Sequence, residues 1–400
     1  MSDTETQNPE TGATESSDTD ERDDVLVVDG LTKIYPDGTL AVDDIDFAIK
    51  EGDFCVIIGP SGCGKSTTLH SLVGKIPPTE GTVTLGGEEI THTPTYHRDI
   101  GLVFQDFQLF PHKSVEENIR YGLERMEIEG QEADERVEDV VRMMQLDGMR
   151  HRSPKELSAG QKQRVALARS LVLKPKLLLL DEPLGDMDYK LQKRMERELL
   201  RIHRELDTTF VYVTHDQTQA MRLADQIVVM NDGKIEHSGP VEEVYNEPNT
   251  AFVATFVGDS NIFFGEITDL ESDGDVAVLD TDFGTFRVST ANLYSDPEDV
   301  VGEEMPFAVR PQFLELGEAN GNALTCDVDD VIYQSGMGTQ LILTAHGEGG
   351  EEKEIQLKSD ERLTVEDDTV TVGFEADNTI LLERQSVVEG IDLEKDILGE

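Results

Sequence analysis

The chain has 400 residues, of which 29% are charged, and its formal net charge at pH 7 is −49. A protein this acidic repels phosphate backbones, which argues against DNA or RNA as its main ligand, so we expect no nucleic-acid partner. Its three cysteines have neither disulfide nor zinc spacing, which indicates a reducing compartment, and no apolar stretch is long enough to predict a membrane span.

The acidic residues are concentrated toward the two ends of the chain. Residues 1–24 hold nine acids and one base, and residues 259–400 hold 35 acids and seven bases. Because residues 1–24 have almost no apolar side chain to bury, we predict a disordered, solvating tail. Acids spread over whole domains are typical of surfaces that stay hydrated in concentrated salt, so we expect a halophilic source.

From residue 25 to residue 258 the chain alternates strands and helices. Helical spacing over 114–150 predicts a helical segment, about 106–170, inserted in an α/β scaffold. Such alternation implies a mostly parallel sheet covered on both faces. Strands are predicted at 25–28, 48–49, 54–58, 82–85, 99–104, 177–180, 210–213 and 226–230. Further helices are predicted after the loop at 59–66 and at 163–173, 191–206 and 219–224.

Beyond residue 258 the pattern changes to short β segments separated by Gly, Asp, Asn and Glu turns. This spacing predicts a small, barrel-like, all-β domain over residues 259–400. The predicted organisation is thus a tail (1–24), an α/β domain (25–258) and a β domain (259–400). The β segments are expected at 264–267, 276–279, 286–288, 307–309, 341–343 and 369–374.

A glycine-rich loop follows the apolar strand at 54–58 and precedes a helix. It matches G-x-x-x-x-G-K-[ST], and its residues are Gly59, Pro60, Ser61, Gly62, Cys63, Gly64, Lys65 and Ser66. Glycines let successive N–H groups point into one concavity, and the following helix N-terminus adds positive potential there. Lys65 can meet the β- and γ-phosphates and Ser66 can bind Mg²⁺. The loop therefore predicts a nucleoside-triphosphate site.

A phosphate-binding loop also needs an acidic element nearby. The apolar strand at 177–180 ends in Asp181 and Glu182, which places both carboxylates at the carboxyl edge of the sheet. Asp181 can hold Mg²⁺ through water, and Glu182 is placed to orient or deprotonate the attacking water. We therefore predict a Mg²⁺-dependent triphosphate hydrolase.

With these motifs in hand, the chain resembles the ATP-binding cassette (ABC) family over roughly residues 25–240. The resemblance also rests on a segment similar to the family's L-S-G-G-Q signature, on the stretch 163–169 after it, on Gln105 after a strand, on Asp188 in a D-loop-like stretch and on His215 at a strand end. The signature-like segment is Leu157, Ser158, Ala159, Gly160 and Gln161.

The resemblance implies a composite site in which two copies, arranged head to tail, enclose two ATP molecules. Tyr35 would stack on adenine, and the loop from Gly59 to Thr67 would cradle the phosphates. Mg²⁺ would be held by Ser66, Gln105 and, through water, Asp181. Glu182 would be the general base, with His215 and Gln105 positioning the γ-phosphate and the water. Contacts with the opposite subunit would come from Ser158, Ala159, Gly160, Gln161 and Asp188.

Two motifs depart from the family pattern. Ala159 stands where glycine is usual, and we expect it to be tolerated unless the backbone there needs a positive φ. In the D-loop-like stretch 184–188 only Asp188 is retained, so only that residue is carried over.

Three classes of protein share this type of ATP-hydrolysing domain: importer ATPases, exporter subunits and soluble ABC ATPases. The chain holds a single cassette and no predicted membrane span. It is also similar to the importer subgroup with a C-terminal TOBE or OB-like domain, in the segments 105–112, 252–261 and 309–314. That similarity implies a membrane permease as partner, an extracytoplasmic solute-binding protein indirectly, and a place on the cytoplasmic face of the cell membrane. The stretch 260–266 is similar to polyamine and ferric-iron importers; polyamine is favoured, with iron, sugar, sulfate and thiamine as alternatives.

Overall fold

The computed structural model describes residues 22–185, 187–206, 208–319, 321–333, 338–365, 367–384 and 386–387. The predicted tail therefore lies almost entirely outside the described residues. The fold already includes residues 22–24, which the sequence placed in that tail: Arg22 Nη1 lies 2.5 Å from Asp53 Oδ1, and strand β1 begins at Asp24. Within the described part of the chain, no helix is long and apolar enough to cross a membrane.

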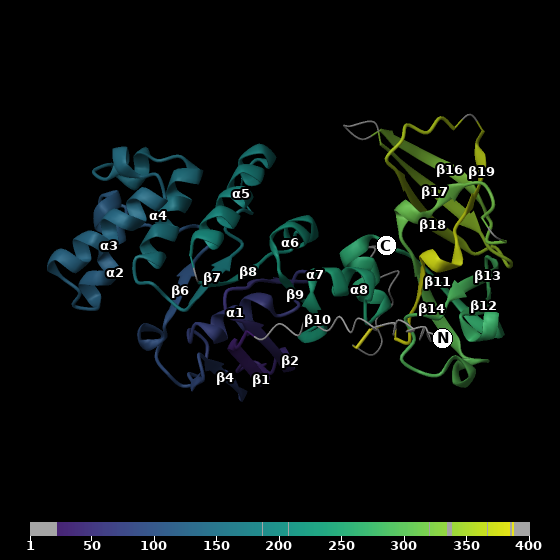
Figure 1. The fold of residues 1–400 in the computed structure, drawn as a ribbon, viewed down its shortest axis with the longest axis horizontal. Helices are drawn as coiled ribbons and strands as arrows, with labels where there is room; N and C mark the ends of the chain where they lie inside the picture. The colour runs from purple at the N-terminus through teal and green to yellow at the C-terminus, as the bar shows by residue number, and fades with distance from the viewer. Residues whose placement is uncertain are drawn as a thin grey trace, which may run out of the picture.

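A six-stranded sheet forms the centre of the α/β part (Figure 1). Its strand order is β10-β9-β3-β8-β7-β6; β10 is antiparallel to β9 and the other neighbours are parallel. Asp232 and Gly233 both have a positive φ in the β9–β10 hairpin, the conformation that a tight two-residue hairpin turn requires. The strands are β3 (Phe54–Ile58), β6 (Ile100–Val103), β7 (Leu177–Asp181), β8 (Thr209–Val213), β9 (Gln226–Asn231) and β10 (Lys234–Pro240).

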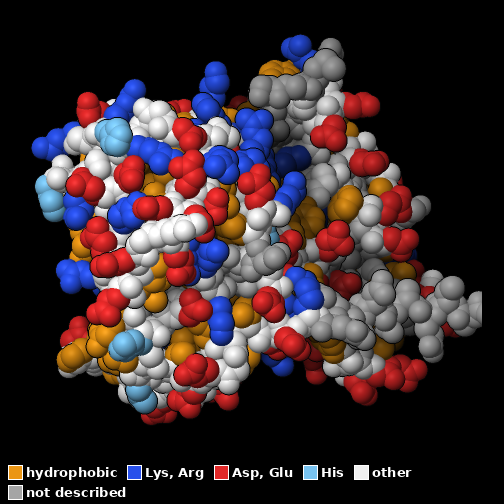
Figure 2. Space-filling view, turned by 60° about the vertical axis from the view of Figure 1, so that its left-hand side comes forward, with side chains coloured by type: hydrophobic (Ala, Val, Ile, Leu, Met, Phe, Trp, Pro, Cys, Tyr) orange, Lys and Arg blue, Asp and Glu red, His pale blue; other side chains and the backbone are white. Residues whose placement is uncertain are grey.

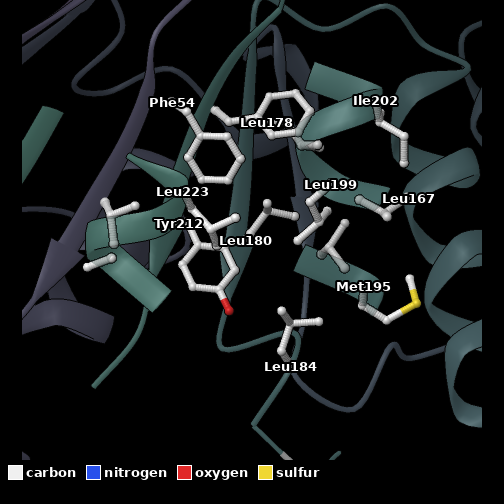
Figure 3. Packing of buried hydrophobic residues seen from close by; sticks show 14 of the residues in the cluster. Phe54, Leu167, Leu178, Leu180, Leu184, Met195, Leu199, Ile202, Tyr212 and Leu223 are labelled. Carbon is white, nitrogen blue, oxygen red and sulfur yellow. The ribbon is translucent and has the colours of Figure 1, made fainter. Parts of the chain in front are cut away.

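Alternate side chains of the buried strands feed two separate cores. Leu178 and Leu180 of β7 join the core on the helical side, whereas Leu177 and Leu179 join the core toward a second sheet. This follows from the two-residue period of a strand, and it explains why the run is apolar at every position. Figure 3 shows Leu178 and Leu180 beside Met195, Leu199 and Ile202 of one covering helix. The mostly parallel, doubly covered sheet predicted from the sequence is confirmed.

The second sheet is antiparallel, with strand order β2-β1-β4-β5, and packs together with α1 (Lys65–Leu72) on the face opposite the other helices. It is made of β1 (Asp24–Ile34), β2 (Leu40–Lys50), β4 (Glu80–Leu85) and β5 (Glu88–Glu89). The helices of this part are α1 (Lys65–Leu72), α2 (Val115–Arg125), α3 (Gly130–Met143), α4 (Ala159–Leu171), α5 (Tyr189–Glu205), α6 (Gln217–Leu223), α7 (Val241–Asn246) and α8 (Ala251–Gly258).

Helix α4 begins at Ala159, four residues earlier than predicted. Ser158 Oγ accepts from the Gln161 N–H at 3.4 Å, and Gln161 Oε1 accepts from the Ser158 N–H at 2.9 Å. This capping box satisfies two backbone donors that would otherwise lack partners at a helix start. The pattern of apolar residues missed it because the first turn of the helix carries no apolar period.

Two five-stranded antiparallel sheets form the C-terminal part and enclose one core, which confirms the predicted all-β, barrel-like fold. Two long strands were not predicted, β16 and β18, because Asp, Glu and Lys, which are uncommon in strands, occupy many of their outward positions. The first sheet holds β11 (Asn261–Glu271), β12 (Val276–Thr281), β13 (Gly284–Ser289), β14 (Glu304–Val309) and β20 (Thr379–Leu381). The second holds β15 (Glu315–Leu316), β16 (Leu324–Tyr333), β17 (Thr339–His346), β18 (Glu352–Ser359) and β19 (Thr369–Gly373).

Two buried charged residues join the α/β part to the β part. Arg310, 2% exposed, donates to the Ala254 carbonyl at 2.8 Å and to the Tyr245 carbonyl, and its guanidinium lies 4.2 Å from the Tyr245 ring centroid. Glu236, 3% exposed, accepts from the Thr250 hydroxyl, the Ser386 hydroxyl and the backbone N–H of residue 387. Helices α7 and α8 therefore lie at a polar junction between the two parts (Figure 1).

Candidate functional site

The predicted site residues of three segments meet at one edge of the central sheet. The glycine-rich loop follows β3, Asp181 ends β7, and His215 follows β8. Because β3, β8 and β7 are parallel neighbours, their carboxyl ends lie side by side. A cavity of about 310 Å³ opens there, lined by Ala41, Ser61, Gly62, Gly64, Lys65, Ser66, Thr67, Glu182 and His215.

The loop backbone requires glycine at two positions. Gly59 has φ 157°, and a Cβ there would meet the Met230 carbonyl oxygen at 2.1 Å. Gly64 has φ 100°, and its Cβ would lie 2.4 Å from the Ala41 carbonyl oxygen. Side chains at these positions would collide with backbone that cannot move away, so the loop holds its N–H groups around the cavity only with glycine.

The Lys65 ammonium group lies against the loop. Its Nζ donates to the carbonyls of Gly59 and Pro60, both at 2.7 Å, and the residue is 7% exposed. This places a positive charge at the wall of the cavity. Cys63 Sγ lies 3.5 Å from the same Nζ, yet burial raises the pKa of the Cys63 thiol. The thiol is thus neutral, in keeping with a small packing residue.

Glu182 and His215 lie in contact in the wall of the cavity, with Glu182 Oε1 3.3 Å from His215 Nδ1. Glu182 has φ 42°, an uncommon conformation for a residue with a side chain, and its N–H donates to the Val213 carbonyl at 3.1 Å. That hydrogen bond ties the strained residue to the end of β8 and so fixes the direction of its carboxylate.

Gln105 lies close to Glu182. A Cβ built on Gly185 would lie 3.5 Å from Gln105 Nε2 and 3.7 Å from Glu182 Oε2. The segment after Gln105 is held by a residue that the sequence analysis did not single out: Arg169 of α4 donates to the carbonyls of Phe107 and Gln108, at 2.9 and 2.7 Å. Both of those residues have positive φ, so Arg169 fixes a strained turn. In the sequence, Arg169 was marked only by its position in the stretch 163–169 that follows the signature-like segment.

Asp181 is partly enclosed, and desolvation by burial raises the pKa of its carboxyl group. His70 of α1 is the nearest base, with Nε2 3.9 Å from Asp181 Oδ2. The sequence analysis did not identify His70, although it lies one helical turn after Ser66 and therefore on the same face. Asp181 and Ser66 offer hard oxygen donors, which suit Mg²⁺. Across the described ranges, no cluster of three His, Cys, Asp or Glu side chains could hold a metal by itself.

Tyr35 also lies beside the loop. Its hydroxyl is 3.2 Å from Thr67 Oγ1, and Lys33 Nζ lies 5.6 Å from its ring centroid. The ring is only partly buried, so one face can meet a planar ligand next to the phosphate cavity.

The signature residues lie outside the cavity of their own chain. Ser158 and Ala159 are exposed at the start of α4, and none of the four residues from Ser158 to Gln161 lines the cavity. Ala159 has no positive φ, so a methyl group brings no backbone strain there. Gly160 is buried, where an added Cβ would be 3.4 Å from both Leu191 and Met195. Asp188 caps α5, its Oδ1 accepting from the Leu191 N–H at 3.0 Å.

Comparisons with known proteins agree with this geometry. Residues 42–185 match the ABC transporter family and residues 307–382 match the TOBE domain. A relative from Rubrobacter xylanophilus, described as a spermidine/putrescine import ATP-binding protein, is 43% identical over 315 residues, covering 79% of this chain and 82% of its own. Proteins of the same description from Thermobifida fusca (40% identical; 77% of this chain, 80% of its own) and Bacillus thuringiensis strain Al Hakam (47%; 60% and 72%) also match.

A solved structure is similar as well: cbiO1 from Clostridium perfringens, part of the ABC transporter complex cbiONQ. The TM-score is 0.53 and the identity 32%, over 56% of this chain and 92% of that one. The similarity covers slightly more than half of the chain here and nearly all of the cbiO1 chain.

Proposed function

This chain belongs to the family of ABC transporter ATP-binding proteins, and we propose that it powers the import of a polyamine such as spermidine or putrescine. It binds and hydrolyses ATP and works at the membrane with permease components. The single observation that carries the polyamine assignment is that several relatives described as spermidine/putrescine import ATP-binding proteins match at 40–47% identity. We place the subunit on the cytoplasmic face, served indirectly by an extracytoplasmic solute-binding protein.

For the hydrolysis step, we propose that Glu182 accepts a proton from the water that attacks the γ-phosphorus. As the O–P bond to the attacking oxygen forms, the bond to the β–γ bridging oxygen breaks and ADP leaves. His215, 3.3 Å from the carboxylate, would hold the γ-phosphate, and Gln105 would orient the water. Lys65 and the loop N–H groups would stabilise the charge of the leaving phosphates.

Mg²⁺ would be held by the Ser66 hydroxyl, by Gln105 and, through water, by Asp181. When bound, it would neutralise charge on the β- and γ-phosphate oxygens. The oxygen donors of Ser66 and Asp181 and the position of Ser66 in the cavity wall support this assignment.

We further propose that two copies close head to tail, so that Ser158 and Gly160 of one copy complete the cavity of the other. The exposure of Ser158 on the surface of the same chain, away from the cavity, supports this arrangement. The binding energy of ATP would drive closure of the dimer, which would exclude water and position the reacting groups. The domain boundary near residue 258 stays a prediction, supported by the end of α8 at Gly258 and the start of β11 at Asn261.

The catalytic assignment is tested with Glu182→Gln. ATP binding should persist while turnover falls by a factor of about 100 or more, as expected when a general base is lost. A matched control, Glu242→Gln, changes an exposed glutamate of α7 and should keep wild-type turnover. Normal hydrolysis by Glu182→Gln would remove Glu182 from its role.

The transport assignment is tested in proteoliposomes. These vesicles carry the cognate permease in the bilayer, this chain inside and the solute-binding protein outside. Labelled spermidine or putrescine should accumulate only with ATP and only with wild-type protein, not with Glu182→Gln. Accumulation of ferric iron, sugar, sulfate or thiamine in place of the polyamine would overturn the substrate assignment and leave the ATPase assignment standing.

A further inference from the structure

Helix α5 has a charge opposite to that of the chain. Its 17 residues carry six bases and three acids, in a protein whose net charge is −49. Figure 2 shows Lys and Arg side chains gathered across the upper part of one face, at the height at which both α4 and α5 lie in Figure 1. A basic surface in so acidic a protein calls for a specific explanation.

Five of the bases form one stripe. They recur at alternating steps of four and three residues, which keeps them on one side of a helix with 3.6 residues per turn. Met195, Leu199 and Ile202, which pack on the sheet, lie on the opposite side of α5 (Figure 3). The stripe therefore faces away from the core. Its members are Lys190, Arg194, Arg197, Arg201 and Arg204.

The three acids of α5 are already paired and do not neutralise this stripe. Glu196 is buried and lies 2.9 Å from Lys193 and 3.8 Å from Arg222 of α6. Glu198 and Glu205 both pair with Arg201, at 2.9 and 2.7 Å.

Four bases of the stripe remain without an ion-pair partner among the described residues, and all four are exposed. We call them the basic face of α5: Lys190, Arg194, Arg197 and Arg204.

A segment of opposite charge starts close to this face. Residues 1–21 contain seven acids and no base. The described chain starts at Arg22, which lines a cavity of about 800 Å³ together with Leu200, His203 and Arg204 of α5. The last turn of α5 and the point where the segment joins the fold thus share one cavity.

We propose that the acidic segment 1–21 docks along the basic face of α5 of the same chain. Reach is sufficient, because 21 extended residues span about 70 Å and a 17-residue helix is about 25 Å long. The segment would run from the cavity at Arg204 toward Lys190, two residues after Asp188. Its far end would then lie beside Asp188, a residue that we assign to contacts between the two copies.

Attachment to the chain makes weak pairs sufficient. One exposed ion pair shifts an equilibrium by a factor of about 1.4 to 5. Four pairs at about twofold each give a factor of about 16, and the tether keeps the local concentration of the segment in the millimolar range. Salt should release the segment, because the Debye length falls to about 3 Å at 1 M.

Carbodiimide cross-linking of the full-length protein tests the proposal, because it joins carboxylates to lysine amines that are in direct contact. The reaction is run on a mixture of unlabelled and ¹⁵N-labelled protein, followed by trypsin, which releases residues 1–22 as one peptide. We expect links from this peptide to Lys190 or Lys193, in same-isotope pairs only, and their loss in 1 M KCl. Lys155 is the control: it is exposed but lies in the short helical turn Pro154–Glu156, outside α5, and should form no link to the peptide.

Arginine variants provide a second readout. Arg194→Gln/Arg197→Gln should reduce the yield of these links at least about twofold, because two of the four pairs are lost. The matched control Arg152→Gln/Lys155→Gln removes two exposed charges away from α5 and should leave the yield unchanged.

Three results would overturn the proposal. One is the absence of any link between residues 1–22 and the lysines of α5. Another is the appearance of these links only in mixed-isotope pairs, which would assign the face to the segment of a second copy. The third is links from these lysines to acids of residues 259–400 alone, which would assign the face to the β part.

Discussion

Arg310 offers the sharpest test of how the two parts of the chain are joined. Replacing it with methionine keeps a long, flexible side chain but removes the guanidinium. Two backbone carbonyls, of Tyr245 and Ala254, then lose a charged donor in a place where water cannot replace it. Tyr245 lies in the last turn of α7, where a cation is favoured by the helix dipole, so that interaction is lost too.

The size of the effect follows from these contacts. A hydrogen bond from a charged donor contributes about 1.5–3 kcal/mol, and the cation–π contact with Tyr245 about 1–2 kcal/mol. The desolvation of a buried charge, which methionine avoids, offsets part of this sum. We expect Arg310→Met to lower the free energy of unfolding by about 3 kcal/mol.

The assay is urea unfolding of the full-length protein followed by far-UV circular dichroism, since the chain has no tryptophan. Arg152→Met, at an exposed position, is the control and should change the unfolding free energy by less than about 0.5 kcal/mol. A loss below about 1 kcal/mol for Arg310→Met would refute the reasoning.

Gly258 supplies a second perturbation of the same contact. A Cβ built on Gly258 would lie 1.2 Å from Arg310 Nη1 and 2.2 Å from its Cζ, so Gly258→Ala must displace the guanidinium. Because methionine at 310 has already removed those atoms, the double variant should cost less than the sum of the two single changes, by about 1 kcal/mol or more. Additive costs would show that the alanine acts elsewhere.

Three further predictions concern the nucleotide site, pH and salt. Lys65→Ala should abolish the rise in melting temperature that ATP gives to the wild type, while the nucleotide-free variant melts within a few degrees of wild type. Burial lowers the pKa of His237, so its folded form stays neutral and stability is lost as pH falls through the ordinary pKa of 6.5; His237→Gln should weaken this loss between pH 7 and 5, measured by urea unfolding. If the source is halophilic, unfolding measured against KCl should show higher stability at molar salt than at low salt, and equal stability would contradict that expectation.

The sequence predicted those parts of the site whose positions are set by the arrangement of the backbone strands. The loop 59–66, Asp181 and His215 each follow an apolar strand, and parallel strands bring their carboxyl ends to one edge wherever the chain goes in between. Strand alternation and glycine spacing are local signals. That is why the fold class and the position of the cavity followed from pattern alone.

Contacts made by single polar side chains across long distances were not predictable. Arg169 reaches carbonyls 61 and 62 residues earlier, and Arg310 reaches one 56 residues earlier. An arginine gives the same local signal whether it is buried or solvated, so neither residue stood out. Strands β16 and β18 were missed for a different reason: Asp, Glu and Lys, which have low strand propensity, occupy many of their outward positions.

The junction and the basic face of α5 should differ in their sensitivity to salt, and this separates their roles. At the junction, the buried charges have neutral partners: Arg310 donates to carbonyls, and Glu236 accepts from hydroxyls and a backbone N–H. Dissolved ions do not screen such hydrogen bonds, so the junction should hold at molar KCl. Docking on the basic face of α5 depends on exposed charges that ions do screen. A KCl titration should therefore release segment 1–21 well before it loosens the contact at Arg310.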